Sequence, residues 1–255
     1  MPELTYADVY CGAGGFSLGF LQAGFKHLWG LDSDKVACAS YEANIGKALC
    51  AVAASVDWLS LLKPDVLIGS PPCQGFSVAG KRQKDDPRNA LVWGFVWAVA
   101  VLRPKAILIE NVPGVGQGDW AQFPSIVRMA LETLGYNVSV FKLNVADYGV
   151  PQIRKRVFWA GMLDGWIQIP PPTHAQGGFV ERENRQWSRE KSMLGLKPWV
   201  TVLSATKNWR QGPPYQAAAR SSYACYLAVR DWDDLQMAEP MLRLNGESHG
   251  KETND

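Results

Sequence analysis

A cysteine in a constrained loop is the first residue of this sequence that could do chemistry. Cys73 stands in the segment GSPPCQGFSVAG, directly after Pro71 and Pro72 and two residues before Gly75. The prolines restrict the backbone ahead of the thiol, and the glycine permits a sharp turn behind it. A thiolate held in this way could act as a nucleophile. Taken alone, however, a loop cysteine is more often a passive thiol than a nucleophile.

Polar side chains of two later segments add to this chemistry. The segment ENVPG carries Glu110 and Asn111 at the end of an apolar run. The segment GVPQIRKRVFWAG has Gln152, Arg154 and Arg156 at alternate positions, so an extended chain would point these side chains to one face. We expect a nucleophile, a carboxylate and an arginine face to converge on one edge of a sheet.

A glycine-rich loop near the N-terminus could hold a cofactor. The segment DVYCGAGGFSLG follows the first apolar run, and Gly12, Gly14 and Gly15 let the backbone approach a ligand closely. Asp32 ends the next apolar run about twenty residues on, where an acid can bind a ribose diol. The glycine spacing matches neither a dinucleotide loop nor an ATP-binding P-loop, so it favours an adenosyl ligand without a phosphate chain. An ordinary solvated turn containing Asp32 and Asp34 is the alternative.

The elements that must position these residues alternate along the first part of the chain. Apolar runs predict strands at residues 4–10, 26–32, 64–70, 105–110 and 156–161. Helical patterns cover residues 18–24, 36–44, 89–102 and 123–135. Buried strands separated by helices predict an α/β fold, with a doubly wound, mixed and mostly parallel sheet and helices on both faces. Ligands of such sheets bind beyond the carboxyl ends of the strands, where the glycine and cysteine loops would lie.

Size, charge and cysteine content argue against several other classes of protein. The chain has 255 residues, a formal net charge of +2 and five widely spaced cysteines. The odd number of cysteines and the lack of a Cys-x-x-Cys pair argue against a disulfide framework or a zinc site, and we expect no metal. The longest apolar run is shorter than the roughly 20 residues that cross a bilayer, and no export signal begins the chain. We therefore expect a cytoplasmic protein without membrane contact.

The pattern of the sequence changes after Met162. A Pro/Gly-rich linker, IPPPTHAQGG, precedes a stretch without clean periodicity. We predict one domain over residues 1–162, which carries the candidate chemistry, and a separate region with a polar tail over residues 163–255. His174 in the linker is better explained by a hydrogen bond to a turn than by metal ligation.

The order of these motifs resembles that of the cytosine-5 DNA methyltransferase family. The resemblance covers residues 4 to about 161, through DVYCGAGGFSLG, GSPPCQGFS, ENVPG and LNVADYGVPQIRKRVF. It implies a Rossmann-like class I methyltransferase fold, S-adenosylmethionine as cofactor, duplex DNA as partner and a restriction-modification system as setting. It further implies that residues 1–162 are the catalytic domain and that residues 163–255 are a partial or degenerate target-recognition-side region. It also implies that Cys73 attacks carbon 6 of a flipped cytosine, which activates carbon 5 for methylation.

The same resemblance implies roles for the other candidate residues. Glu110 would bind ring nitrogen 3 and the exocyclic amine, Arg154 the base carbonyl, and Arg156 would order the cysteine loop. Substrate contacts are implied for Gln74, Ser77, Asn111 and Gln152. Cofactor contacts are implied for Tyr10, Gly12, Gly14, Gly15, Asp32, Asp57, Trp58, Pro72 and Leu91. Four positions depart from the family pattern: Tyr10 replaces Phe, Asp32 replaces Glu, Ser33 replaces a bulky apolar residue and Trp58 replaces an aliphatic residue.

The family's two final motifs are not recognisable in residues 163–255. Three explanations stay open. In the first, the chain is one subunit of a split enzyme, and a second polypeptide carries the recognition region and the final motifs. In the second the chain is a truncated form, and in the third it is a compact variant. The split and truncated explanations together are favoured, so we expect the isolated chain to bind cofactor weakly and to methylate little DNA. A transfer-RNA cytosine-5 methyltransferase and a non-catalytic, methyltransferase-like regulatory subunit are the alternative functions.

Overall fold

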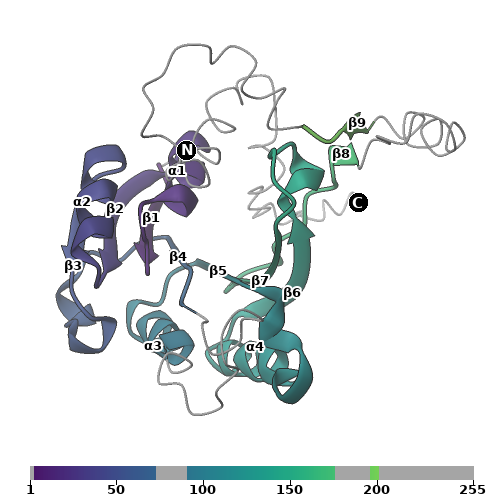
Figure 1. Cartoon of the computed structure of the whole chain (residues 1–255). Coiled ribbons are helices and arrows are strands. Elements are labelled where there is room, and N and C mark those ends of the chain that lie inside the picture. The colour runs from purple at the N-terminus through teal and green to yellow at the C-terminus, as the bar shows by residue number, and fades with distance from the viewer. Residues whose placement is uncertain (1–2, 73–90, 176–195, 201–255) are drawn as a thin grey trace, which may run out of the picture.

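A seven-stranded sheet forms the centre of the computed structural model, which describes residues 3–72, 91–175 and 196–200 (Figure 1). The strand order is β3-β2-β1-β4-β5-β7-β6. The strands are β1 (Thr5–Val9), β2 (Lys26–Asp32), β3 (Ala48–Cys50), β4 (Val66–Gly69), β5 (Ala106–Asn111), β6 (Asn137–Asn144) and β7 (Lys155–Met162). The α-helices are α1 (Gly15–Gln22), α2 (Lys35–Asn44), α3 (Leu91–Leu102) and α4 (Phe123–Thr133).

Short elements complete the described part of the chain. The 3-10 turns are η1 (Ala53–Ser55), η2 (Trp58–Ser60), η4 (Pro113–Gly116), η5 (Gly118–Trp120) and η6 (Val145–Tyr148). A separate two-stranded sheet pairs β8 (His174–Ala175) with β9 (Lys197–Pro198). None of the helices within the described ranges combines the length and the apolar character that crossing a membrane requires.

Strand direction confirms the predicted sheet. Strand β7 is antiparallel to both of its neighbours, β5 and β6, and every other pairing is parallel. All four residues of the central strand β4 are buried, which explains why its sequence shows no alternation of apolar and polar residues. Because β1, β2, β4 and β5 are parallel, the segments that follow them meet at one edge of the sheet. The glycine loop, Asp32, the start of the cysteine loop and Glu110 all belong to this edge.

Helices cover both faces of the sheet, as the sequence predicts. On one face, Phe20 of α1 lies 5.3 Å from Tyr6 of β1 between ring centroids, and Ser17 of α1 hydrogen-bonds to Tyr41 of α2. On the other face, strand residues such as Ala7 join one core cluster with α3 and α4. Successive residues of a strand point to opposite faces, so β1 contributes Tyr6 to one layer and Ala7 to the other.

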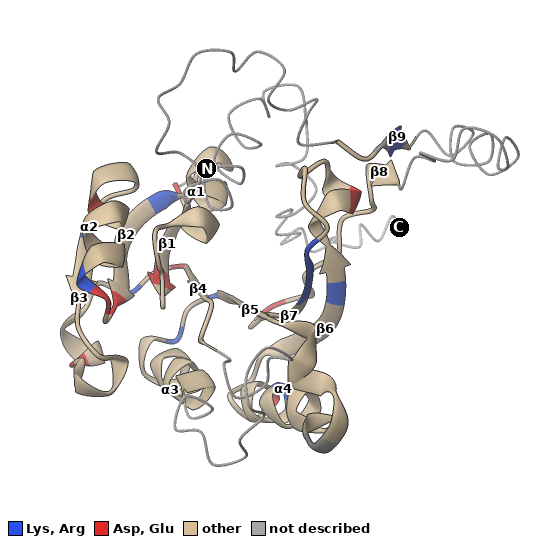
Figure 2. Ribbon diagram, in the orientation of Figure 1, with Lys and Arg blue, Asp and Glu red and all other residues tan. Residues whose placement is uncertain are grey.

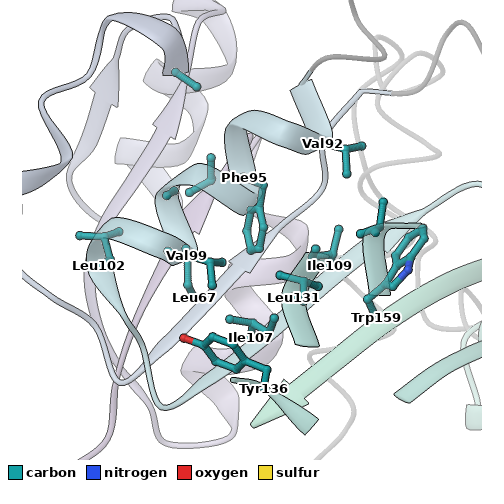
Figure 3. Packing of buried hydrophobic residues seen from close by; sticks show 14 of the residues in the cluster. Leu67, Val92, Phe95, Val99, Leu102, Ile107, Ile109, Leu131, Tyr136 and Trp159 are labelled. Atoms are coloured by element: carbon teal, nitrogen blue, oxygen red, sulfur yellow. The ribbon is translucent and has the colours of Figure 1, made fainter. Parts of the chain in front are cut away.

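The larger hydrophobic core lies between the sheet and helices α3 and α4 (Figure 3). Phe95, Val99 and Leu102 of α3 are at most 1% exposed. Trp159 of β7 is fully buried, and its indole N–H donates to the carbonyl of Pro124 at 2.9 Å. Burial of each such side chain contributes roughly 1.5–3 kcal/mol, so this core fixes the position of β5 and β7.

Some elements differ from the sequence prediction. Strands β3 and β6 are not predicted, because β3 has three residues and only one residue of β6 is buried, which leaves no clear periodicity. Helix α1 begins at Gly15 rather than at residue 18, because Gly14 takes a φ of 96° and ends the loop there. Part of the predicted helix 89–102 lies outside the described residues. The domain boundary after Met162 stays a prediction.

Candidate active site

The glycine loop, residues 10–15, is fixed by backbone hydrogen bonds. The amide of Gly12 donates to Oδ2 of Asp32 at 2.9 Å, and the amide of Cys11 donates to the carbonyl of Leu31 at 3.0 Å. Gly14 adopts a left-handed conformation that favours glycine. The loop is therefore tied to the end of β2 and leads straight into the first turn of α1.

Asp32 and Asp34 have different roles in the turn after β2. Oδ1 of Asp34 accepts from the amides of Val36 and Ala37 at 2.7 and 3.1 Å, so Asp34 is the N-cap of α2. Asp32 is half-buried and accepts from the amides of Gly12 and Asp34. The ordinary-turn interpretation thus fits Asp34, whereas Asp32 links the turn to the glycine loop and keeps lone pairs for another donor.

Tyr10 and Leu91, two of the predicted cofactor residues, are brought together by the fold. The Tyr10 hydroxyl donates to the carbonyl of Leu91 at 2.9 Å, across 81 positions of sequence. Gly94 makes room for this contact, since a Cβ there would lie 2.7 Å from the Tyr10 oxygen. Burial, followed by the nearby charge of Asp32, raises the pKa of Tyr10 to about 12, so its hydroxyl stays a hydrogen-bond donor.

The other predicted cofactor residues lie in different surroundings. Asp57 is exposed, and its Oδ1 accepts from the amide of Leu59 at 3.2 Å as the N-cap of η2. Trp58 is 5% exposed and packs against Trp29 in the core, with 6.3 Å between ring centroids. Pro72 is exposed at the end of the described segment. Trp58 therefore contributes its bulk to the hydrophobic core.

Glu110, Arg154 and Arg156 form one cluster, called here the carboxylate–arginine cluster. Oε1 of Glu110 lies 2.6 Å from Nε of Arg156 and 3.3 Å from an amino nitrogen of Arg154. The antiparallel pairing of β5 with β7 places Glu110 opposite Phe158, so Arg156 lies on the same face two residues away. Burial and the neighbouring charge of Arg154 lower the pKa of Arg156, and the Glu110 carboxylate opposes that shift. The predicted convergence of the carboxylate with these two arginines is confirmed.

Asn111 connects this cluster to the cysteine loop. Its side chain is 2% exposed; Nδ2 donates to the carbonyl of Pro71 at 3.4 Å, and Oδ1 accepts from the amide of Val112 at 2.7 Å. Among the described residues, the base of the cysteine loop is therefore held against the end of β5. Three further predicted residues lie outside the described part of the chain: Cys73, Gln74 and Ser77.

The segment that carries the arginines is held by residues to which the sequence assigns no role. The backbone amide of Arg154 donates to Oδ1 of Asn144 at 3.1 Å, and its carbonyl accepts from Val145. Gln152 precedes β7, and its backbone N–H donates to the carbonyl of Val150 at 2.7 Å. The sequence predicts that Gln152, Arg154 and Arg156 point to one face of an extended segment, but the strand itself begins only at Lys155.

Residues after Met162 brace the same segment. The amide of Thr173 donates to the carbonyl of Asp147, and the indole of Trp199 donates to Oδ1 of Asp147 at 2.8 Å. The His174 ring hydrogen-bonds to Thr173 Oγ1 at 2.9 Å and packs against Gly149, where a Cβ would lie 2.9 Å from the ring. His174 thus makes the kind of turn contact that the sequence predicts.

Comparison with known proteins identifies the family of this site. The sequence matches the family model described as "C-5 cytosine-specific DNA methylase" over residues 4–249, which is most of the chain. The chain belongs to this family. The matched range includes both the glycine loop and the carboxylate–arginine cluster.

Curated methylases of this family differ in length from the chain. The Type II methyltransferase M.AgeI of Thalassovita gelatinovora is 41% identical over 186 residues, which are 67% of the chain but 42% of the relative. The Type II methyltransferase M.AquIA of Picosynechococcus sp. is 33% identical over 241 residues, which are 85% of the chain and 93% of the relative. The chain thus spans about half the length of many matched methylases and nearly the full length of M.AquIA.

A solved structure has the same fold. The crystal structure described as a DNA modification methyltransferase encoded within a prophage (E. coli) superposes with a TM-score of 0.60 and 26% sequence identity. The superposition covers 83% of the chain and 56% of the prophage protein. The methylase fold of the chain is therefore established by sequence and structure together.

Proposed function

We propose that this chain is the cofactor-binding and catalytic part of a DNA (cytosine-5) methyltransferase, which forms a covalent adduct between Cys73 and a flipped cytosine. One observation carries the proposal: the Glu110 carboxylate is held by Arg154 and Arg156 at the sheet edge where the cysteine loop begins. A carboxyl group beside a guanidinium offers both acceptors and donors, which suits the ring nitrogen, amine and carbonyl of cytosine.

The residues around the glycine loop fit an S-adenosylmethionine molecule. A Cβ at Gly12 or Gly15 would meet no described atom within 4 Å, so the loop backbone is open to a ligand. The half-buried carboxylate of Asp32 can accept hydrogen bonds from ribose hydroxyls, and the hydrogen-bonded pair of Tyr10 and Leu91 can line the adenosyl group. When bound, S-adenosylmethionine supplies the electrophilic methyl group.

The protein's own residues prepare cytosine to receive that group. The Cys73 thiolate forms a bond to carbon 6, and the electrons of the C5–C6 double bond make carbon 5 nucleophilic. As the thiolate adds, ring nitrogen 3 takes up a proton that is held between the Glu110 carboxyl group and the ring, which neutralises the developing negative charge. Glu110 also accepts from the exocyclic amine, and Arg154 donates to the carbonyl. After methylation, a base removes the proton from carbon 5. The electrons of that C–H bond re-form the C5–C6 double bond, and the bond between carbon 6 and sulfur breaks to release the Cys73 thiolate. Base flipping exposes carbon 6 to the thiol.

Basic residues on β6 and β7 suit a duplex DNA partner. Figure 2 shows Lys and Arg on these two strands, of which Lys142 and Lys155 are exposed. Lysine and arginine contacts to phosphate supply much of the affinity of proteins for DNA. We further propose that a second polypeptide carries the target-recognition region and the final motifs. The Type II methyltransferase M.AquIA has nearly the same length, so a methylase chain of this size has a precedent among the relatives.

Trapping on duplex DNA that contains 5-fluorocytosine tests the chemistry. Fluorine at carbon 5 cannot leave as a proton does, so the adduct persists and runs as a larger species in denaturing gels. We expect an adduct from the wild type, in the presence of S-adenosylmethionine and the product of any neighbouring reading frame. Cys73→Ser should form none, and Cys50→Ser, which changes an exposed thiol, should form as much as the wild type. An adduct with Cys73→Ser would contradict the mechanism.

Labelled methyl transfer tests the substrate. We expect label from S-adenosylmethionine in duplex DNA and none in bulk transfer RNA. Label in transfer RNA alone would overturn the DNA assignment while keeping the cytosine-5 chemistry. Full, sequence-specific DNA methylation by the isolated chain would overturn the proposal of a second polypeptide.

A further inference from the structure

A chain of buried polar side chains lies behind the glycine loop. Oδ2 of Asp8 accepts from the hydroxyl of Ser17 at 2.7 Å, and Ser17 Oγ lies 2.6 Å from the hydroxyl of Tyr41. The Tyr41 oxygen lies 3.0 Å from Nε2 of His27. Asp8, Ser17 and Tyr41 are each 0% exposed. Buried polar groups of this kind are costly unless they are paired, so their continuity specifies one arrangement of the elements that carry them.

This hydrogen-bonded series of Asp8, Ser17, Tyr41 and His27 is called here the relay. Its members come from four elements that surround the loop. Asp8 lies on β1, immediately before the loop, and Ser17 lies in the first turn of α1, immediately after it. Tyr41 comes from α2 and His27 from β2. The relay therefore ties both ends of the glycine loop to the layer behind it.

The Tyr41 ring also packs against the loop itself. A Cβ on Gly14 would lie 3.1 Å from Cδ2 of Tyr41, so no side chain separates the loop backbone from this ring. A Cβ on Gly30 of β2 would lie 2.6 Å from the same ring. The ring thus supports the loop from behind, and the hydroxyl fixes where the ring lies.

Proton counting gives the relay a direction. Ser17 has one hydroxyl proton, and it is donated to Asp8. The 2.6 Å contact with Tyr41 therefore takes its proton from Tyr41. The Tyr41 oxygen is then an acceptor, and Nε2 of His27 is the donor that faces it. Each hydroxyl is used once as donor and once as acceptor, so loss of one member leaves a buried group of the next member unpaired.

We propose that Tyr41, with Ser17 and His27, positions the glycine loop for the cofactor, so that breaking the relay weakens cofactor binding and leaves the methylation rate at saturation unchanged. The inference rests on the proposed function, because it concerns the binding of S-adenosylmethionine. None of the three residues is placed in contact with the cofactor. Each acts through the backbone of Gly14 and the first turn of α1.

Tyr41→Phe and Tyr136→Phe form a matched pair for the test. Each substitution removes one hydroxyl from a buried ring, since Tyr136 is 2% exposed and donates to the carbonyl of Pro104 at 2.7 Å. Tyr136 belongs to the other core, between the sheet and α4, and has no contact with the loop among the interactions described. A general loss of stability should affect the two variants alike, whereas a positioning role affects only Tyr41→Phe.

The dissociation constant of S-adenosylmethionine is measured by calorimetry for the full chain, with its partner polypeptide if binding requires one. We expect Tyr41→Phe to raise it about tenfold and Tyr136→Phe to change it less than about twofold. The rate at saturating cofactor should stay within about twofold of wild type for both. His27→Leu, at a half-buried position that tolerates change more easily, should raise the constant about threefold. Equal effects of Tyr41→Phe and Tyr136→Phe, or no effect of either, would overturn the inference.

Amide hydrogen exchange of residues 9–18, measured without cofactor, separates failure of the relay from failure of the proposed function. Faster exchange of this segment in Tyr41→Phe, but not in Tyr136→Phe, supports the positioning role. Unchanged exchange contradicts it. A wild-type protein that binds no S-adenosylmethionine would contradict the proposed function instead, and the exchange result would still decide whether the relay holds the loop.

Discussion

The glycine loop and the carboxylate–arginine cluster lie at the same edge of one sheet, but different forces hold them. The loop is held by backbone amides and by a left-handed glycine, supported by fully buried neutral hydroxyls. The cluster is held by ion pairs between side chains, and the side chain of Arg154 is 41% exposed. The geometry of the loop therefore depends on backbone conformation, whereas the geometry of the cluster depends on attraction between charged side chains.

This difference predicts different weaknesses. A backbone-held site should be sensitive to the size and φ preference of single residues and insensitive to salt. A site built on ion pairs should tolerate changes of shape but not changes of charge, because one guanidinium left beside another is repelled. Five substitutions test these expectations, in order of decreasing effect.

Removal of the Glu110 charge should have the largest effect. Glu110→Gln keeps the size of the side chain but leaves Arg154 and Arg156 without their shared anion, so methyl transfer should fall at least about a hundredfold. The dissociation constant of S-adenosylmethionine should hardly change. Radiolabelled methyl transfer and calorimetry measure the two quantities. Glu132→Gln is the control, because it removes another arginine-paired carboxylate, 2.7 Å from Arg128 on α4, and should leave activity intact.

A side chain at Gly14 should disturb the loop through its shape. Gly14→Ala strains a φ of 96° and brings Cβ to within 2.5 Å of a carbon of Ile45, which should lower the free energy of unfolding by about 2 kcal/mol. Cofactor binding should weaken in parallel. Gly19→Ala, within α1 and with no atom within 4 Å of its Cβ, should instead be neutral or slightly stabilising. Denaturant unfolding of both variants makes the comparison, and equal destabilisation would contradict the backbone explanation.

The pH dependence of stability should report the buried end of the relay. Burial raises the pKa of Asp8 to about 7, the hydrogen bond from Ser17 opposes the shift, and Asp32 adds to it. Between about pH 4 and pH 7 the folded state keeps a proton that the unfolded state has lost, so the free energy of unfolding contributed by Asp8 falls as pH rises. Asp8→Asn should remove this slope in urea unfolding measured across that range.

Asp65, at the opposite edge of the sheet, should show the reverse behaviour. Burial acts to raise its pKa, but hydrogen bonds from Lys105 and Thr5 outweigh it and the pKa is lowered. Its contribution is present above about pH 4 and is lost as pH falls below that value. Asp65→Asn should therefore lower the free energy of unfolding at pH 7. The decrease of that free energy with pH that Asp8 causes should stay in place. An identical pH profile for Asp8→Asn and wild type would contradict the assignment to Asp8.

Loss of the α2 N-cap should have the smallest effect. Asp34→Ala removes two hydrogen bonds to the first turn of α2 and should lower the free energy of unfolding by about 1 kcal/mol. The dissociation constant of S-adenosylmethionine should change little, since Asp32 stays bonded to Gly12. A larger loss of cofactor binding than of stability would show that the turn after β2 has a direct part in the site.

The class of the sheet and most residues of the candidate site can be predicted from the sequence alone. Apolar runs separated by helical patterns predict the parallel strands, because strands buried on both faces need continuous apolar residues. Glu110, Arg154 and Asp32 are recognisable because each follows or flanks such a run. The glycine loop is recognisable too, because Gly12 and Gly14 adopt a left-handed conformation that favours glycine.

Which of these residues come into contact, and which interactions hold them, depends on contacts between segments distant in sequence. The pairing of β5 with β7 brings Arg156 to Glu110, and no local pattern encodes that register. The fold also assigns Trp58 to the core and Asp34 to a helix cap, since burial and capping depend on neighbours distant in sequence. The relay from Asp8 to His27 joins four elements through single hydroxyl groups. Ser17 and Tyr41 give no sign of it in sequence, because a buried hydrogen bond is specified by three-dimensional position and not by residue type alone.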